Sequence, residues 1–311
     1  MLYPALDQLQ SQPQSQEKSI GWLENPDIRP YVFVRQENRI VFPGQLFELD
    51  WFPREPIYKN PLHMENLPFA DRILDLETRL FAQANMAMPR WVFYDCGVMP
   101  GFVAGFAARP KALSQKVKEV IGASSGLESL DSEDWVPLSL FIIIPTMGEG
   151  EWVAHNLSSI NALLPKIERF YGLGFLTKAF ALWYANIEIC CGMTQWGSPS
   201  LKLHSHYGAF EVLTAYTPVH SYAQTLTYRL SVDPRYWCHF FDQKPNKEFM
   251  EKYEEAGFQV HPKEDKSLKS FQRKIELGEG PFFLDANEIL SQPLDEPLRV
   301  YRPISKEAKE C

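Results

Sequence analysis

The run Leu138–Pro145, which reads LSLFIIIP, constrains the fold more than any other segment. A membrane-spanning helix needs roughly 20 apolar residues, so this run is too short to be one. Its β-branched and aromatic residues favour a buried strand. Gly148–Gly150 is predicted to turn the chain, and Trp152–Leu157 to return as the antiparallel partner of the run. The chain should therefore be built around a sheet.

Helices and strands are predicted to alternate around this pair. Upstream we expect a hairpin, a helix and two strands, at 31–34 with 39–42, Asp71–Met86, Trp91–Asp95 and Phe102–Ala108. Downstream we expect helix, strand, helix and two strands, at Phe175–Asn186, Ile187–Met193, Ser198–Tyr207, Phe210–Tyr216 and Thr225–Val232. This order predicts an α/β (α+β) fold with a mixed, mostly antiparallel sheet and flanking helices.

The chain outside this sheet is predicted to form extensions. Residues 1–27 read as a polar N-terminal arm, and residues 28–234 as the folded domain, with an insertion at 111–134. Residues 235–311 read as a helical or irregular C-terminal extension, with a helix near Lys247–Ala256.

Composition excludes several classes of partner. The chain of 311 residues has a net charge of −8 and no long run of Lys and Arg, which argues against nucleic acid. No segment is long enough to span a membrane, and Met1–Lys18 lacks the apolar core of a signal peptide. The odd number of cysteines without metal-site spacing favours reduced thiols and a cytoplasmic location; they are Cys96, Cys190, Cys191, Cys238 and Cys311.

The segment from Arg169 to Phe175, RFYGLGF, carries the main functional signal. Gly172 and Gly174 precede the predicted apolar helix, where a tight turn would expose backbone N–H groups at the positive end of the helix dipole. Arg169 could add a charge-assisted contact to phosphate. The residues themselves leave two interpretations open, a simple tight turn or a diphosphate site. Thr177 stands where a dinucleotide fingerprint needs glycine or alanine.

The downstream segments extend this signal. Arg169-x-x-Gly172-x-Gly174 is followed by the predicted helix, by the strand IEICCGM, and by SPSLKLHSHYGAFEVL from Ser198 to Leu213. In order and spacing these segments resemble the GNAT superfamily, the acetyl-coenzyme A dependent N-acetyltransferases. The resemblance covers some forty residues and also fits the upstream strands. Nothing comparable covers residues 1–70 or 235–311.

The resemblance implies a site and a reaction. Acetyl-CoA, or another acyl-CoA, would place its diphosphate on the amides of the loop, and its pantetheine arm would lie between two splayed parallel strands. The implied cofactor-binding residues are Arg169, Phe170, Tyr171, Gly172, Leu173, Gly174, Phe175 and Ser198. A small-molecule or peptide amine would attack the thioester directly, which needs a base and an acid.

The same resemblance guides the choice of catalytic candidates. His204 stands where the family usually has its acid Tyr, and imidazole can also donate a proton near neutral pH. For the base we nominate His155 or Glu151, and less strongly Glu188. Structural roles remain open for the first two, as a partly buried histidine bonded to a carbonyl and a solvated carboxylate in a turn. Asp95, Cys96 and Arg109 are further candidates for the acceptor groove.

Departures from the family pattern leave two alternatives. Ser198 replaces the family's Asn, and Gly208-Ala-Phe210 widens its Gly-Phe, so a degenerate protein that binds CoA or a partner without acetylating stays open. A metal site at His204 and His206, near Cys190 and Cys191, is the other. On a helix two residues this close point about 200° apart, so we predict no metal there.

Overall fold

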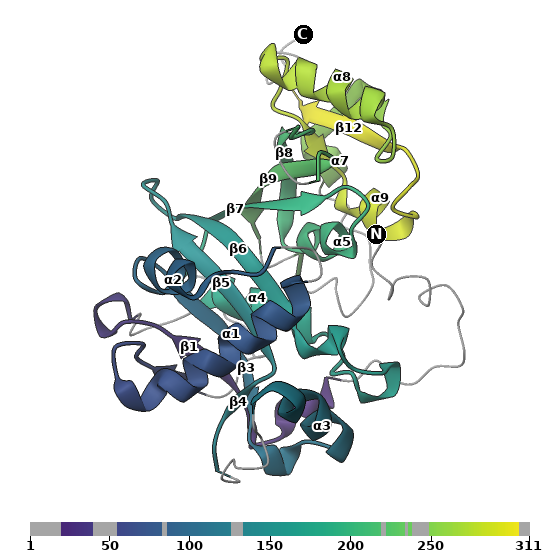
Figure 1. Ribbon diagram of the computed structural model, residues 1–311. Coiled ribbons are helices and arrows are strands. Elements are labelled where there is room, and N and C mark those ends of the chain that lie inside the picture. Colours follow the sequence, from purple (N-terminus) through teal and green to yellow (C-terminus); the bar gives the residue numbers. More distant parts are fainter. Residues whose placement is uncertain are drawn as a thin grey trace. The chain divides into compact units, whose positions relative to one another are not determined.

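The computed structural model describes residues 20–39, 55–82, 86–125, 133–218, 222–233, 236–237 and 249–304 (Figure 1). The chain divides into two compact units. The first, here the N-terminal unit, comprises Met1–Phe42, Glu48–Ile144 and Asn156–Ala181; the second, the C-terminal unit, comprises Pro43–Phe47, Pro145–His155 and Leu182–Cys311. We describe each unit by itself.

The N-terminal unit is built on a short mixed sheet. β1 (Ile28–Phe33) pairs antiparallel with β3 (Phe102–Ala108) and parallel with β2 (Ile57–Lys59). β3 pairs antiparallel with β4 (Val136–Pro137) and β5 (Ser139–Pro145). β6 (Glu151–Ser159) neighbours β5, and the second half of β6 belongs to this unit. β3 and most of β5 are buried, as expected for central strands without polar alternation.

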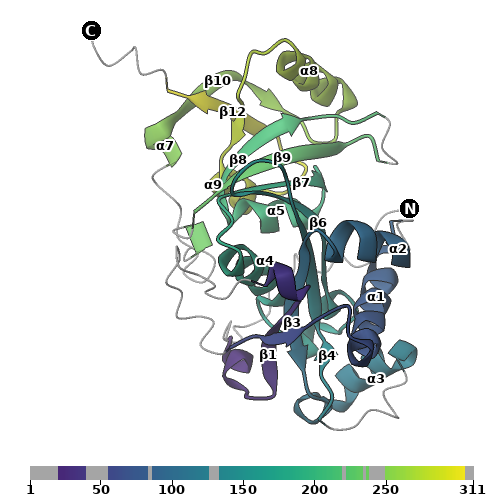
Figure 2. The ribbon, with the colours of Figure 1, turned by 90° about the vertical axis from the view of Figure 1, so that its left-hand side faces the viewer.

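Helices cover both faces of this sheet (Figure 2). α1 (Leu67–Phe81) packs on one face, where the Phe69 ring meets Tyr31 edge-on at a centroid distance of 5.0 Å. α4 (Leu173–Tyr184) packs on the other face, where the Thr177 hydroxyl donates to Ser139 Oγ at 2.6 Å. Smaller helices are α2 (Arg90–Val92), which runs into a π-helical turn at Phe93–Val98, and α3 (Gln115–Ser125).

Several upstream predictions are corrected here. The hairpin of 31–34 with 39–42 is wrong, because β2 and β3 occupy both edges of β1; residues 40–42 lie outside the described residues. Trp91–Asp95 is helical rather than a strand. The predicted helix at Asp71–Met86 exists but begins at Leu67 and ends at Phe81. The predicted strand Phe102–Ala108 is confirmed to the residue.

The C-terminal unit holds a second run of strands. The first half of β6 pairs parallel with β7 (Ile189–Gln195), which pairs antiparallel with β9 (Thr225–Val232). β8 (Gly208–Thr214) pairs antiparallel with β9. The run then continues from β8 through β11 (Phe283–Leu284) and β12 (Leu298–Pro303) to β10 (Tyr253–Val260), each pair antiparallel.

Residues after 248 are therefore not the helical or irregular extension that we predicted. The helix expected near Lys247–Ala256 is reduced to α7 (Phe249–Lys252), and β10 follows at once. α8 (Asp265–Glu276) packs its Phe271 ring edge-on against Phe258 of β10 at 5.4 Å. α9 (Ala286–Ser291) begins at Asp285, whose side chain accepts from Asn287 N at 2.9 Å. The predicted division of the chain into functional domains stays a prediction.

Taken unit by unit, the described strands form mixed and mostly antiparallel sheets flanked by helices, which confirms the predicted fold class. None of the helices in the described part of the chain is both long and apolar enough to cross a bilayer.

Candidate functional site

The predicted diphosphate loop belongs to the N-terminal unit and follows β6. It opens with a 3-10 turn at Ile160–Ala162, and the Asn161 side chain then bridges across the loop to Phe170. Asn161 Nδ2 donates to Phe170 O at 2.7 Å, and Phe170 N donates to Asn161 Oδ1 at 2.9 Å. One side chain thus fixes both backbone groups of Phe170. Asn161 was not among the predicted site residues.

The loop closes on α4 through Gly172. Its φ is 74°, in the left-handed region where side chains with a Cβ are strained. Gly172 O accepts from Leu176 N at 2.8 Å, the first hydrogen bond of the helix. Gly174 lies in the first turn of α4, where helix N–H groups lack an acceptor within the helix. Such groups can bind an anion.

Two of the nominated amide groups are committed within the loop. Phe170 N donates to Asn161, and Leu173 N donates to Phe170 O at 3.2 Å. These two N–H groups already have acceptors within the loop, and the assignment of the loop residues to a diphosphate site stays a prediction. An anion site would therefore depend on the other nominated amides, those of Tyr171, Gly172, Gly174 and Phe175.

The flanks of the loop are also held in place. Arg169 is exposed, and its Nε donates to Leu164 O at 3.0 Å, which anchors the base of the guanidinium group. Trp22 Nε1 donates to Tyr171 O at 2.9 Å, and its ring meets Phe170 edge-on at 5.9 Å. Trp22, which lies in the predicted polar arm, therefore packs against this loop. Residues 1–19 lie outside the described residues.

In the C-terminal unit, the parallel pair β6–β7 is short. The register joins three positions, Glu151–Val153 with Ile189–Cys191. Both strands run on, β6 to Ser159 and β7 to Gln195, with no further pairing between them among the described residues. Where a pair of strands parts, its backbone N–H and C=O groups need other partners, which an extended ligand can supply.

The predicted bases lie on one face of this pair, because alternate residues of a strand share a face. Glu151 Oε1 accepts from the Cys191 thiol at 3.2 Å, and its other oxygen lies 3.9 Å from Arg229 Nη2. Burial, followed by the effect of Glu151, raises the pKa of Cys191 to about 12. Glu151 is half-buried, whereas His155, four residues further along the strand on the same face, is exposed.

The predicted acid lies on the opposite, buried face. His204 of α5 (Pro199–Ser205) is 6% exposed, and its ring centroid lies 4.9 Å from that of Tyr228 on β9. Tyr228 is the direct partner of Gly192 in the β7–β9 register. Tyr228 was missed at the sequence level. The available signal was Gly192 itself, since a glycine inside a strand often marks the close approach of another group.

Ser198 has a structural role in this unit. Its Oγ accepts from Ser200 N at 3.3 Å and caps α5, with Pro199 at the first helical position, as the Ser-Pro sequence predicted. Ser198 Oγ also lies 2.6 Å from Ser200 Oγ. A contact of Ser198 with a cofactor stays a prediction.

The histidines and cysteines of α5 and β7 do not gather into a metal site. Within the described residues, no group of three or more His, Cys, Asp or Glu side chains could hold an ion. His204 is in α5, and His206 follows the helix in a turn. Burial lowers the pKa of His206 to about 4.

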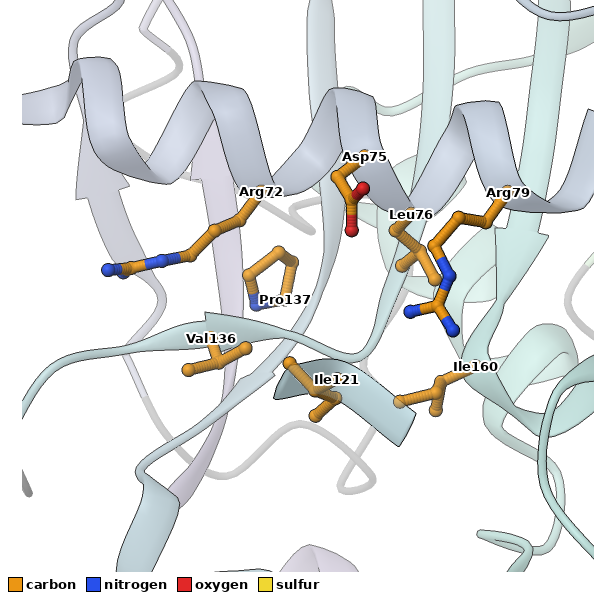
Figure 3. A pocket seen from close by; sticks show the side chains of 8 residues that line it. All are labelled: Arg72, Asp75, Leu76, Arg79, Ile121, Val136, Pro137 and Ile160. Atoms are coloured by element: carbon orange, nitrogen blue, oxygen red, sulfur yellow. The ribbon is translucent and has the colours of Figure 1, made fainter. Parts of the chain in front are cut away.

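A small pocket in the N-terminal unit lies away from the diphosphate loop (Figure 3). Its two cations already have partners, since Arg72 pairs with Asp134 at 3.5 Å and Arg79 Nη1 donates to Val120 O at 2.6 Å. It therefore gives no reason to expect an anion there. The pocket is lined by Arg72, Asp75, Leu76, Arg79, Ile121, Val136, Pro137 and Ile160.

Comparison with known proteins adds similarity to solved structures only. No family model and no curated protein matches the sequence. Among solved structures, one provisionally named an acyl-CoA N-acyltransferase, from Klebsiella pneumoniae subsp. pneumoniae MGH 78578, aligns with 53% of this chain and 93% of its own. Its sequence identity is 13% and its TM-score is 0.31, values that assign neither a family nor an activity.

Proposed function

We propose that this chain binds an acyl-coenzyme A thioester and transfers the acyl group to an amine by direct attack. The amine nitrogen forms a bond to the thioester carbonyl carbon, the C–S bond breaks, and sulfur leaves with the electron pair. The amine is a small molecule or part of a peptide, and acetyl-CoA is the first donor to test. The GNAT resemblance of residues 169–213 motivates this choice.

One observation carries the proposal: the parallel pair β6–β7 ends after Val153–Cys191, although both strands continue. The chain between these strands passes through the loop of Gly172 and through α4. A pantetheine arm carries amide groups that can bond to strand edges left open in this way. A diphosphate suits the amides at the start of α4, with Arg169 supplying positive charge.

Residues of the C-terminal unit suit the two proton movements of the reaction. Glu151 and His155 lie on one face of β6, where either can take the proton of the attacking ammonium group. His204 lies on the other face, packed on Tyr228. The base that deprotonates the amine and the group near the leaving sulfur would therefore lie on separate faces of the strand.

Binding can be tested by replacing Gly174 with Glu. An acidic residue in the first turn of α4 suits the helix dipole and has a better helix propensity than glycine, so the fold should be retained. The same carboxylate would repel a diphosphate. We expect acetyl-CoA and CoA to raise the Tm of the native chain and not that of Gly174→Glu.

Gly197→Glu is the matched control, because an added Cβ there meets no atom within 4 Å. It should keep the full Tm shift. A Gly174→Glu variant that binds CoA as tightly as the native chain would show that α4 does not hold the diphosphate.

Turnover requires its own assay, release of free thiol from acetyl-CoA and longer acyl-CoA donors with a panel of amines. Thiol release that depends on the amine supports the transferase. CoA binding without release of thiol from any donor would instead identify the degenerate, non-acetylating alternative.

A further inference from the structure

Four side chains surround Cys191 on the face of the C-terminal unit that carries Glu151. Glu151 and Val153 come from β6, where Val153 is the register partner of Cys191. Met193 lies two positions further along β7, and Arg229 on β9 is the other register partner of Cys191. These side chains project to the same side of the strands, because alternate residues of a strand share a face. We call the five residues the Cys191 patch.

Arg229 supplies the positive charge of the patch. Its side chain is 40% exposed, and its Nη2 lies 3.9 Å from Glu151 Oε2, a long separation for an ion pair. Within the described part of the chain this is the only ion pair of Arg229, although Glu211 is its partner in the β8–β9 register. A guanidinium group has five N–H donors in a planar fork that matches a carboxylate. The fork of Arg229 can therefore bind a carboxylate from a ligand.

Glu151 places a negative charge next to this fork. Its Oε1 accepts from the Cys191 thiol at 3.2 Å, and its Oε2 faces Arg229. An α-amino acid carries an ammonium group and a carboxylate on one carbon, and these are the charges that Glu151 and Arg229 complement. Binding of such a ligand would replace the long contact between the two side chains with short, charge-assisted hydrogen bonds to each.

The other side chains of the patch are apolar and open to solvent. Met193 is 53% exposed and Val153 is 36% exposed. Val153 is the last residue of β6 that pairs with β7, and Met193 lies on the unpaired part of β7, so the two are close neighbours where the strands part. Covering them removes apolar surface from water, which an apolar side chain of a bound amino acid can do.

We propose that the acceptor is a free, apolar α-amino acid and that Arg229 determines this specificity by binding its carboxylate. This inference rests on the proposed function. Glu151 takes a proton from the ammonium group, and the nitrogen forms its bond to the thioester carbonyl carbon. The C–S bond breaks, sulfur leaves with the electron pair, and solvent protonates the thiolate. The product is an N-acyl amino acid, which has no ammonium group for Glu151 to hold.

A structural role for Arg229 makes a different prediction. An exposed ion pair between strands contributes little to stability and has no influence on the choice of acceptor. Replacing Arg229 would then change the rate with all amines alike, or with none. Acceptors that differ only in their carboxylate separate the two roles.

The native chain is tested with three acceptors that share one side chain: L-leucine, L-leucinamide and 3-methylbutylamine. Thiol release from acetyl-CoA gives kcat/KM for each, and the comparison is repeated with methionine and phenylalanine and their amides. We expect the amino acids to be preferred, although the amides are the more reactive amines at neutral pH because their amino pKa is lower. Thiol release that depends on the amine but shows no preference for any amino acid over its amide would refute the inference and leave the proposed function standing.

Arg229→Gln should lower kcat/KM for the preferred amino acid by about 10- to 100-fold, the usual effect of losing a hydrogen bond to a charged group, and leave that for its amide unchanged. Arg229→Lys keeps the charge without the fork and should lie between Arg229→Gln and the native chain. Arg302→Gln is the matched control, because Arg302 also pairs with a glutamate across strands, Glu254 at 2.9 Å, and is 56% exposed. It should behave as the native chain. Equal losses for the amino acid and its amide in Arg229→Gln would contradict the inference.

The CoA-dependent Tm shift distinguishes the possible failures. Arg229→Gln should keep this shift, which would show that the variant is folded and binds the donor. If Arg229→Gln does not fold, Arg229→Lys and the native preference between amino acid and amide decide the question. A native chain that neither binds CoA nor releases thiol would overturn the proposed function, and this inference with it.

Discussion

The thiol of Cys191 donates a hydrogen bond to Glu151 Oε1 at 3.2 Å, which joins β7 to β6 within their short parallel pairing. With its pKa raised to about 12, this thiol is not a thiolate at neutral pH. Because the thiolate is the nucleophilic form, Cys191 is unsuited to carry the acyl group. We therefore expect Cys191→Ala to keep the transfer rate within about threefold, a loss small enough to exclude covalent catalysis. Intact-mass measurement after incubation with acetyl-CoA should show no acetylated enzyme, and an acyl adduct on Cys191 would contradict direct attack.

Replacing Glu151 with Gln should remove the base. The expected loss in kcat is about 10²- to 10⁴-fold near pH 7. The deficit should shrink as the pH approaches the amine pKa of about 10, because the amine then loses its proton without help. The pH profile of kcat checks this recovery. Glu188→Gln is the comparison, since Glu188 is the weaker candidate base, an exposed carboxylate just before β7; if Glu151 is the base, this variant should behave as the native protein. Native activity in Glu151→Gln would point to His155 as the base, and a pH-independent loss would show that Glu151 does not act as a base.

His206 should make the fold sensitive to acid. Burial lowers its folded-state pKa to about 4, below the ordinary value of 6.5. Between these values the unfolded chain binds a proton that the folded chain refuses, so stability is fully present above pH 6.5 and is lost as the pH falls toward 4. The loss is at most about 3 kcal/mol. Urea unfolding at pH 7 and pH 5 should show a smaller difference for His206→Gln than for the native chain. Equal pH dependence in both proteins would mean that His206 is not the group responsible.

The buried carboxylate of Glu77 should stabilise the N-terminal unit through the hydrogen bonds that it accepts. Its two oxygens accept from Met88 N at 3.1 and 3.0 Å, and Oε1 also accepts from Asn156 Nδ2 at 2.7 Å. Glu77→Ala removes the acceptor that both donors share, so we expect a loss of about 2–4 kcal/mol in the free energy of unfolding. Glu77→Gln keeps a carbonyl oxygen and should cost less.

Asp71→Asn on the same helix is the comparison for Glu77. Asp71 pairs with Arg90 at an exposed position, and exposed ion pairs contribute about 0–1 kcal/mol. Urea unfolding should therefore rank the three variants with Glu77→Ala as the least stable. A Glu77→Ala variant no less stable than Asp71→Asn would show that the buried contacts contribute little.

Local sequence patterns correctly predicted the helices and strands whose structure depends on residues close by in sequence. The alternation of Thr225–Val232 fixed β9 to the residue, and Ser198-Pro199 correctly predicted the start of α5. The predictions failed where contacts with residues distant in sequence determine the secondary structure. The glutamate-rich β10 has a helical composition, yet Glu254 and Glu255 pair across the strands with Arg302 and Arg299 at 2.9 Å each.

The candidate site was predictable in the same uneven way. The glycines and Arg169 are readable because the motif is contiguous. The Asn161 bridge to Phe170 spans nine positions, and the reach of Tyr228 over Gly192 joins two strands 36 positions apart in sequence. No local periodicity encodes such contacts, because they exist only once the loop and the sheet have folded.

Asn161 should therefore be the most informative residue of the diphosphate loop. Its side chain holds Phe170 N–H and C=O, and the carbonyl of Phe170 in turn accepts from Leu173 N at the start of α4. Asn161→Ala removes both contacts without touching Gly172 or Gly174. We expect a loss of about 1–3 kcal/mol in unfolding free energy, chiefly because Phe170 N–H loses its acceptor, while Phe170 O still accepts from Leu173 N. Asn161→Asp keeps the acceptor for Phe170 N–H and should lose less. If the loop is the CoA site, affinity for CoA should fall in the same order, Asn161→Ala below Asn161→Asp below native, when binding is measured by calorimetry under conditions where all three proteins are folded. A loop that loses stability while affinity stays constant would separate the conformation of the loop from ligand binding, and would locate the diphosphate elsewhere.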